Sequence, residues 1–377
     1  MHSDFASLVT KLSGNANAAC IFMPGGAVPR VGALLRQPEL AATLERIARN
    51  GRDEMYTGET ARDMVATLQA LGGLHTAEDF ATAKGEYVTP ISGGFRDHLV
   101  HQCPPNGQGV IALLLLNVMS GIEVGDDPIS LERMHAEIEA GRLTYAARDA
   151  WLADPAMAEV PVEQLLSADY AEAVCAAIDP TQAQEREAPL DLPRHESTVY
   201  ITVVDRDRNA CSFINTLFKG FGSGICTPSG VLLTNRAEGF SLDPASPNRI
   251  EGGKRPLHTI IPGMVSKGGR VVMPYGVMGG QYHAFGHMQF LTRYFDYGLD
   301  IQEAMDTPRF MPDPFEGNVD VESGVSVPLQ QQLGGLGHRV TQPSRPIGGS
   351  QAIWIDWDEG VLTGGSDPRK DGSAMGY

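Results

Sequence analysis

The stretch that most constrains the fold runs from Arg194 to Gly224 and reads RHESTVYITVVDRDRNACSFINTLFKGFGSG. Residues 198–204 are β-branched or aromatic at most positions, residues 205–209 are polar, and residues 210–218 are again rich in apolar side chains. Two apolar runs around a short polar turn predict a β-hairpin. Taken alone, Thr198 needs no role beyond opening the first strand.

The segment before this hairpin has a different character. Residues 179–193 read DPTQAQEREAPLDLP, which is polar, punctuated by proline and without helical or strand periodicity. Such a segment predicts an exposed linker. Its position matters, because an exposed linker directly before Thr198 would let the chain move away if the Ser197–Thr198 bond were cut.

Motifs on both sides of the hairpin give the chain a family resemblance. Before the hairpin stand PGG at 24–26, NGRDEMYTG at 50–58 and PPNGQG at 104–109. After it stand GVLLTN at 230–235, GKRPLHT at 253–259, VMGG at 277–280 and SDPRKDG at 366–372. In this order, and with the hairpin's threonine, VVD turn and FGSG, the chain resembles the gamma-glutamyltranspeptidase family over essentially its whole length.

Elements read from the residues give an α+β chain. Periodicity and helix start and stop signals predict helices at 40–48, 60–71, 110–119, 131–152, 163–178, 287–294 and 301–306, with another opening at the cap 76–79. Residues 1–36 read as a helix followed by a short strand and loop. Beyond the hairpin and an extended run that ends at Val100, strands are expected at 230–233, 260–264, 270–273, 351–356 and 360–364.

The resemblance sharpens this class to the four-layer αββα sandwich of N-terminal-nucleophile hydrolases. It implies one domain made of a large-subunit portion, residues 1–197, and a small-subunit portion, residues 198–377. The large-subunit portion would end in the linker 179–197. In the family the large subunit begins with a further segment that carries sheet strands and a substrate-binding arginine, so we expect a sandwich that lacks its first strands.

The resemblance assigns Thr198 the role of nucleophile. A threonine hydroxyl is a weak nucleophile at neutral pH unless a base lies beside it. Family members cut themselves before a threonine, and the freed α-amine, with an ordinary pKa of about 7.7–8.0, becomes the base for the same residue. Carried over, Thr198 attacks the carbonyl of Ser197 first and the substrate amide afterwards.

Three further residues match the family's catalytic group. Thr216 corresponds to the threonine that hydrogen-bonds the nucleophile, although it could be an ordinary strand residue. Gly279 and Gly280 match the glycine pair whose backbone N–H groups stabilise the oxyanion, where a Cβ would obstruct the tetrahedral centre. Their alternative interpretation is a plain turn. The loop 103–109 is either the entrance to a helix or, as the resemblance implies, part of the surroundings of the substrate.

The expected substrate pocket departs from the transpeptidase pattern. The family's LNNQMDDF becomes LTNRAEGF at 233–240, so Gly239 replaces the aspartate that would hold the substrate ammonium. The residues expected to contact substrate are Asn235, Arg236, Glu238, His258 and Thr259. Losing a carboxylate that pairs with the substrate ammonium weakens substrate binding. Glu238 could replace it, but it is one position away, and in a strand its side chain would point to the opposite face. The pattern resembles the acylase-like branch, in which Arg236 and His258 would contact an acyl carboxylate or carbonyl, unless both only pack in the core.

Composition excludes several other classes. A net charge of −17 argues against binding nucleic acid or anionic membranes. Five cysteines without a C-x-x-C pair predict free thiols. The first residues, MHSDF, contain no basic segment before an apolar run, which predicts a cytoplasmic protein without a signal peptide. His195-Glu196 lacks the second histidine of a zinc-protease motif and His283/His287 lack an acidic partner motif, so we expect neither metal nor cofactor.

Together these observations predict a self-processing gamma-glutamyltransferase-like amidohydrolase, a zymogen that acts on gamma-glutamyl or related acyl amides through an acyl-Thr198 ester. Its partners would be the small-molecule substrate and the second cleaved piece of the same chain, with a homo-oligomer left open. Two alternatives remain: an inactive homologue serving as a scaffold, and an amidase for a glutaryl donor or a small dicarboxylic monoamide. Cleavage of the chain separates the inactive homologue from the other two readings, because both of those require it.

Overall fold

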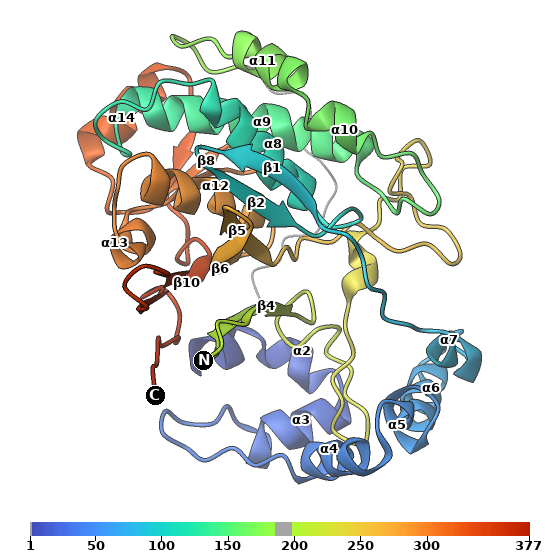
Figure 1. Ribbon diagram of the computed structural model, residues 1–377. Coiled ribbons are helices and arrows are strands. Elements are labelled where there is room, and N and C mark those ends of the chain that lie inside the picture. The colour runs from blue at the N-terminus through green and yellow to red at the C-terminus, as the bar shows by residue number, and fades with distance from the viewer. Residues whose placement is uncertain (1, 185–197) are drawn as a thin grey trace. The chain divides into compact units, whose positions relative to one another are not determined.

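The computed structural model describes residues 2–184 and 198–377, and these form two compact units (Figure 1). Unit 1 comprises Met1–Tyr87 and Leu217–Arg236, and unit 2 comprises Val88–Thr216 and Ala237–Tyr377. Residues 217–236, which follow the hairpin, group with the N-terminal helices. The expected boundary at 197/198 marks a cleavage position and stays a prediction. Residues 185–197, with most of the expected linker and Ser197, lie outside the described residues.

Unit 1 is built from short helices. They are α1 (His2–Ser7), α2 (Val9–Ser13), α3 (Ala16–Phe22), η1 (Pro24–Gly26), α4 (Pro38–Asn50), α5 (Asp53–Tyr56), α6 (Glu59–Ala70) and α7 (Ala77–Ala81). The expected cap at Thr76 is present: its hydroxyl accepts from the backbone N–H of Asp79, whose carboxylate accepts from the N–H of Thr76. The strand expected within residues 1–36 is absent from the described part of that segment.

The returning segment 217–236 is held to these helices by polar contacts. The Lys11 ammonium donates to the carbonyls of Gly220 and Gly222 at 3.0 and 2.9 Å. The expected strand at 230–233 is wrong, since only a single bridge between Cys226 and Leu232 forms. The reason is local: the N–H and C=O of Leu233 pair with residues 225 and 223 of the same loop.

Unit 2 contains a six-stranded antiparallel sheet in the order β1-β2-β5-β6-β10-β11. Its strands are β1 (Ile91–Phe95), β2 (His98–Gln102), β5 (Gly263–Lys267), β6 (Arg270–Met278), β10 (Gly349–Ile355) and β11 (Leu362–Ser366). The strand expected at 260–264 thus begins three residues late, and the one expected at 270–273 extends to Met278.

Helices cover one face of this sheet. They are α8 (Gly109–Ser120) and α12 (Tyr282–Phe295), and α9 (Leu131–Trp151) packs against α8. Residues 110–116 of α8 are all buried, in keeping with an apolar run that has no polar face. Around them lie α10 (Val162–Leu165), α11 (Ala168–Ala177), α13 (Ile301–Asp306), α14 (Val327–Gly335) and a small sheet of β7 (Phe310–Pro312), β8 (Val319–Val321) and β9 (Val340–Thr341). The single helix expected at 163–178 is therefore two.

The predicted hairpin is confirmed and stacks on the other face of the large sheet. It consists of β3 (Val199–Val204) and β4 (Ala210–Asn215), paired from Val199↔Asn215 to Val204↔Ala210. The ring of Tyr200 lies on Gly276 of β6, where a Cβ would overlap it. The next residue of β6, Val277, touches α12 at Gly286. Helices, large sheet and hairpin thus form three successive layers of unit 2.

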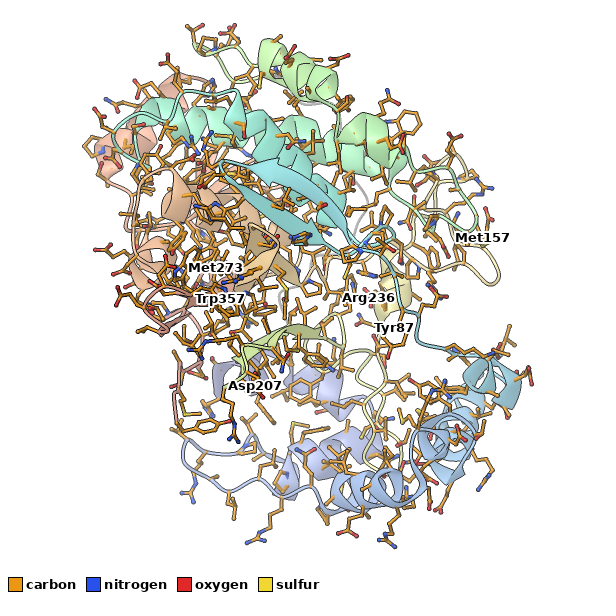
Figure 2. The ribbon with its side chains drawn as sticks, in the orientation of Figure 1. Tyr87, Met157, Asp207, Arg236, Met273 and Trp357 are labelled. Atoms are coloured by element: carbon orange, nitrogen blue, oxygen red, sulfur yellow. The ribbon has the colours of Figure 1, made fainter. Side chains whose placement is uncertain are left out.

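Figure 2 labels one residue in each of the two stacked β layers of unit 2. Asp207 lies in the turn of the hairpin, and Met273 lies in the buried centre of β6. No helix in the described part of the chain is long and apolar enough to cross a membrane. All five cysteines are free thiols, as predicted.

Candidate active site

Thr198 and Thr216 meet at the open end of the hairpin. The register pairs Val199 with Asn215, so the residues just outside that pair, Thr198 and Thr216, stand opposite each other. The Thr198 hydroxyl donates to the Thr216 hydroxyl at 3.4 Å, and Thr198 is only 4% exposed. A buried hydroxyl beside a second hydroxyl has the local geometry that a nucleophile and its hydrogen-bond partner require.

The way the hairpin stacks directs this end toward the glycine pair. Ser212, which lies opposite Thr202, donates to the carbonyl of Tyr275, whereas Tyr200 covers Gly276. Progress from residue 202 to residue 200 therefore follows β6 in the direction of its C-terminal end. Stacked sheets keep their strand directions within about 30°, so the next inward-facing residue, Thr198, faces the end of β6 that continues into Gly279.

Gly279 and Gly280 form a turn that only glycine tolerates. Their φ values are +135° and +64°, and a Cβ on Gly279 would lie 2.7 Å from the Cα of Gly348. The carbonyls of both glycines accept bonds from Tyr282 and His283 at the start of α12. The turn thus places backbone without Cβ atoms at the N-terminus of a helix, where the helix dipole stabilises developing negative charge.

A buried polar network supports this turn. The amide nitrogen of Gln108, which is fully buried, donates to the carbonyls of Thr259 at 3.2 Å and Gly280 at 3.5 Å. Arg148 from α9 donates to the side-chain oxygen of Gln108 at 3.3 Å and to that of Gln281. The loop before α8 is therefore more than a helix entrance, because its glutamine ties the glycine turn to Thr259.

His258 and Thr259 lie on a segment that is paired with the same loop. The N–H of His258 donates to the Asn106 carbonyl, and the N–H of Gln108 donates to the His258 carbonyl, both at 3.2 Å. The Thr259 carbonyl also accepts from Nδ1 of His283 at 2.6 Å, which fixes the proton of that ring on Nδ1. The structure brings these two predicted residues to the network beneath the turn.

Asn235 and Arg236 belong to unit 1. The Asn235 side-chain oxygen accepts from the N–H of Lys219 at 3.1 Å. The Arg236 guanidinium lies 4.2 Å from the centre of the Phe218 ring, and its Nη1 and Nη2 are buried without a hydrogen-bond partner among the described residues. Burial lowers the pKa of Arg236 to about 10. No acidic side chain among residues 2–184 and 198–377 forms an ion pair with this guanidinium.

Residues 236–239 form a 3-10 helix, η2 (Arg236–Gly239), so the expectation that strand geometry governs the direction of Glu238 is wrong. Glu238, in unit 2, is exposed. Gly239 is buried, and a Cβ there would lie 2.8 Å from the carbonyl oxygen of Leu257. The position that carries an aspartate in the transpeptidase pattern therefore has no room for one in this structure.

Comparison with known proteins agrees with this arrangement. A model of the family described as gamma-glutamyltranspeptidase matches residues 1–377. The chain belongs to this family. It is 36% identical over 375 residues to a glutathione hydrolase-like proenzyme of Bacillus subtilis, which covers 97% of the chain and 70% of that protein. It is 34% identical to the glutathione hydrolase proenzyme of Escherichia coli, covering 97% of the chain and 66% of the relative.

Among solved structures, a cephalosporin acylase from Bacillus halodurans superposes with a TM-score of 0.91 at 36% identity, over 100% of this chain and 70% of that one. The chain thus spans about two thirds of the length of these relatives. The predicted N-terminal-nucleophile hydrolase fold is confirmed, and the protein is an amidohydrolase of this family.

The supporting residues Gln108, Arg148, Gln281 and His283 were not predicted from the sequence. Gln108 stands inside a motif that the resemblance singled out, so the motif was a usable signal for it. Arg148 carried none, since it lies in the middle of a long helix whose buried positions include several charged residues. Only the packing of α9 against the other elements reveals its role.

Proposed function

We propose that the chain cuts itself between Ser197 and Thr198 and then uses Thr198 to cleave amides whose acyl group carries a free carboxylate. The observation that carries this proposal is the hydrogen bond of 3.4 Å between the hydroxyls of the buried Thr198 and the half-buried Thr216. After cleavage the Thr198 α-amine would take the hydroxyl proton, and the hydroxyl oxygen would attack the substrate carbonyl. The resulting acyl ester would be resolved by water or an amine.

The oxyanion of each tetrahedral intermediate needs hydrogen-bond donors that are already in position before the reaction. The turn at Gly279 and Gly280 offers backbone without Cβ atoms at the start of α12, held in place by Gln108. Donors fixed in advance stabilise developing charge without paying for their own reorientation. We assign the oxyanion to this turn.

The acyl group is proposed to be recognised by its carboxylate alone. Arg236 supplies a guanidinium whose terminal nitrogens have no partner in the described part of the chain, while Gly239 leaves no space for an ammonium-binding aspartate. A glutaryl donor would therefore be cleaved about as well as a gamma-glutamyl donor. The similar proteins include glutathione hydrolases and a cephalosporin acylase, which supports an amide as the substrate.

Two measurements test the proposal. The intact mass of purified protein should show two pieces, of 197 and 180 residues from the 377 of the chain, and N-terminal sequencing of the smaller should read Thr-Val-Tyr. Processed protein should then hydrolyse gamma-glutamyl and glutaryl anilides at similar rates, and water should outcompete glycylglycine as acceptor. A folded chain that stays intact would contradict the processing step. A thousandfold preference for the gamma-glutamyl anilide would contradict recognition by the carboxylate alone.

A further inference from the structure

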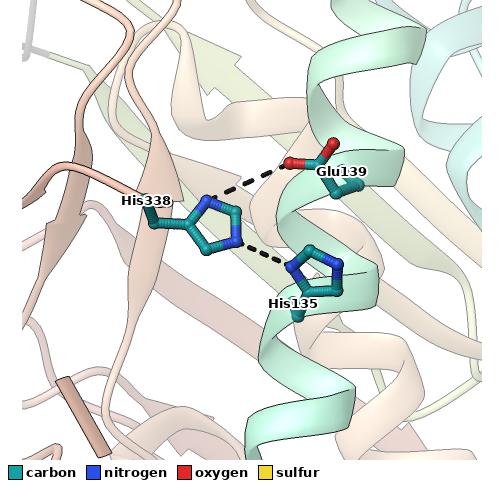
Figure 3. Close-up of side chains that lie close together, drawn as sticks. All are labelled: His135, Glu139 and His338. Carbon is teal, nitrogen blue, oxygen red and sulfur yellow. Dashed lines mark hydrogen bonds and ion pairs between the residues drawn. The ribbon is translucent and has the colours of Figure 1, made fainter. Parts of the chain in front are cut away.

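A buried cluster of His135, Glu139 and His338 lies in unit 2, outside the residues assigned to catalysis (Figure 3). His135 and Glu139 are one turn apart on the same face of α9, and both are at most 2% exposed. His338, 3% exposed, follows α14, where its N–H caps the helix by donating to the Leu333 carbonyl. One donor atom from each of the three residues lies within 4.8 Å of the others.

The hydrogen bonds determine where the imidazole protons sit. Nε2 of His135 lies 2.7 Å from the carbonyl oxygen of Asp179, which only accepts, so this nitrogen carries the proton. Nδ1 of His135 therefore presents a lone pair, and Nε2 of His338 donates to it at 2.7 Å. With its proton on Nε2, the neutral ring of His338 leaves a bare lone pair on Nδ1.

That lone pair has no donor among the described residues. Nδ1 of His338 is buried and points at Oε1 of Glu139, 4.0 Å away. A buried nitrogen lone pair that faces a carboxylate oxygen is unfavourable, because two acceptors repel and neither is solvated. The opposite tautomer, with the proton on Nδ1, would satisfy both groups but would leave two bare lone pairs, Nδ1 of His135 and Nε2 of His338, facing each other.

We propose that a divalent transition-metal ion of the zinc class binds between Nδ1 of His135 and Nε2 of His338, with Glu139 as its anionic partner. The ion displaces the proton that the two rings share. That proton moves to Nδ1 of His338, and the resulting N–H donates a hydrogen bond to the Glu139 carboxylate. Both ligand rings then have the support typical of metal-binding histidines: the distal N–H of one meets a backbone carbonyl, and that of the other meets a carboxylate. Imidazole nitrogens are ligands that zinc, copper and nickel prefer.

Binding of a metal ion requires the two imidazole rings to move slightly apart. Zinc–nitrogen bonds of about 2.0–2.1 Å at tetrahedral angles separate two ligand nitrogens by roughly 3.4 Å, compared with 2.7 Å here. Glu139 is already shared, since Oε1 accepts from Arg142 at 2.7 Å and Oε2 from the N–H of Gln184 at 3.1 Å. The nearby guanidinium opposes a second cation, so we expect a site that exchanges its ion rather than one that retains it through purification.

The cluster also holds the stretch of chain from Asp179 to Gln184. His135 binds the carbonyl of the first of these residues, Glu139 binds the N–H of the last, and the N–H of Ala183 donates to the Leu336 carbonyl beside His338. An ion that orients both side chains would tighten this anchor. Hydrogen exchange of the backbone N–H of Gln184 therefore reports on the site, because it does not depend on enzyme activity.

The test begins with protein that has been stripped by a chelator and dialysed. Titration with Co²⁺ should give visible absorption bands that saturate at one ion per chain and vanish when Zn²⁺ is added. Zn²⁺ should also slow hydrogen exchange at the Gln184 amide. His135→Gln and His338→Gln should each weaken binding more than about 100-fold, and Glu139→Gln by about 10–100-fold as expected for an outer partner. His287→Gln, which alters a fully buried imidazole of α12, is the matched control and should leave binding unchanged.

Either of two results would overturn the proposal: no saturable binding by folded protein, or binding that survives both histidine substitutions. In that case the cluster is a hydrogen-bonded structural pair. Should the histidine variants not fold, X-ray absorption of zinc-loaded wild-type protein decides the question instead. It should show two imidazole ligands, and a shell of oxygen ligands only would refute the assignment.

Discussion

The proposed nucleophile and the proposed substrate pocket are built in opposite ways. Thr198 and Thr216 extend a regular hairpin, and the register from Val199↔Asn215 onward determines that they face each other. Arg236 and Gly239 lie instead in a 3-10 turn after an irregular loop, held by local contacts such as that between Arg236 and Phe218. The proposed nucleophile thus rests on regular structure, and the proposed specificity residues rest on irregular structure.

This contrast explains how one family cleaves different amides. A strand register cannot change by one residue without turning every side chain to the other face, so the threonine pair tolerates little variation. A loop residue can change its chemistry while the backbone stays in place. Here Gly239 stands where the transpeptidase pattern has aspartate, and the Leu257 carbonyl lies close to it; we expect this difference to change substrate recognition without affecting the hairpin.

The largest expected effect follows from removing the nucleophile. Thr198→Ala should abolish both self-cleavage and amide hydrolysis, because the same hydroxyl performs both attacks. Thr198→Ser keeps the hydroxyl and should retain part of both activities. Intact mass after prolonged incubation measures the first and anilide hydrolysis the second. Cleavage that continues in the alanine variant would show that regular structure does not carry the chemistry.

Much of this region could be predicted from the sequence. Two β-branched or aromatic runs around a polar turn are local signals strong enough to predict the hairpin, whereas the partnership of Thr198 with Thr216 was expected from the family resemblance. Helix α13 was predicted with the bounds it has, Ile301–Asp306. The two capping residues Asp300 and Glu303 explain why, since a capping box marks a helix start in the sequence itself.

The second largest effect concerns the pocket. Arg236→Ala should raise KM for acidic acyl donors by one to two orders of magnitude, equivalent to the roughly 1.5–3 kcal/mol of a charge-assisted hydrogen bond. Self-cleavage should be unaffected. Arg206→Ala, which removes a guanidinium from the hairpin turn, is the control. Equal KM values for Arg236→Ala and wild type on every acidic donor would remove Arg236 from substrate binding.

A smaller effect is expected from the partner hydroxyl. Thr216→Val keeps the volume of the side chain and removes one hydrogen bond of about 1 kcal/mol, so kcat should fall about fivefold. Thr202→Val, which makes a similar change four pairs deeper in the hairpin, should leave kcat unchanged. If both variants behave like wild type, Thr216 is an ordinary strand residue.

The pocket and the histidine cluster could not be predicted in the same way. The width available at Gly239 depends on Leu257, which reaches it through the packing of two loops. His135 and His338 are 203 residues apart in the sequence, and neither lies in a metal-binding motif. Contacts of this kind arise from tertiary packing alone, so residue patterns carry no signal for them.

The smallest expected effect is on specificity, and it sharpens the comparison most. Gly239→Asp restores the residue of the transpeptidase pattern, yet its Cβ would meet the Leu257 carbonyl oxygen at 2.8 Å. The substitution should lower stability by about 1–3 kcal/mol and leave the ratio of gamma-glutamyl to glutaryl hydrolysis unchanged. Gly252→Asp adds the same charge where a Cβ meets nothing within 4 Å, and it should alter neither quantity. Thermal unfolding and the paired anilide rates measure both. A rise of tenfold or more in the gamma-glutamyl preference would mean that the loop around Leu257 moves to make room for the new side chain. In that case the chemistry of the side chain at position 239 decides specificity, and the space left by the backbone does not.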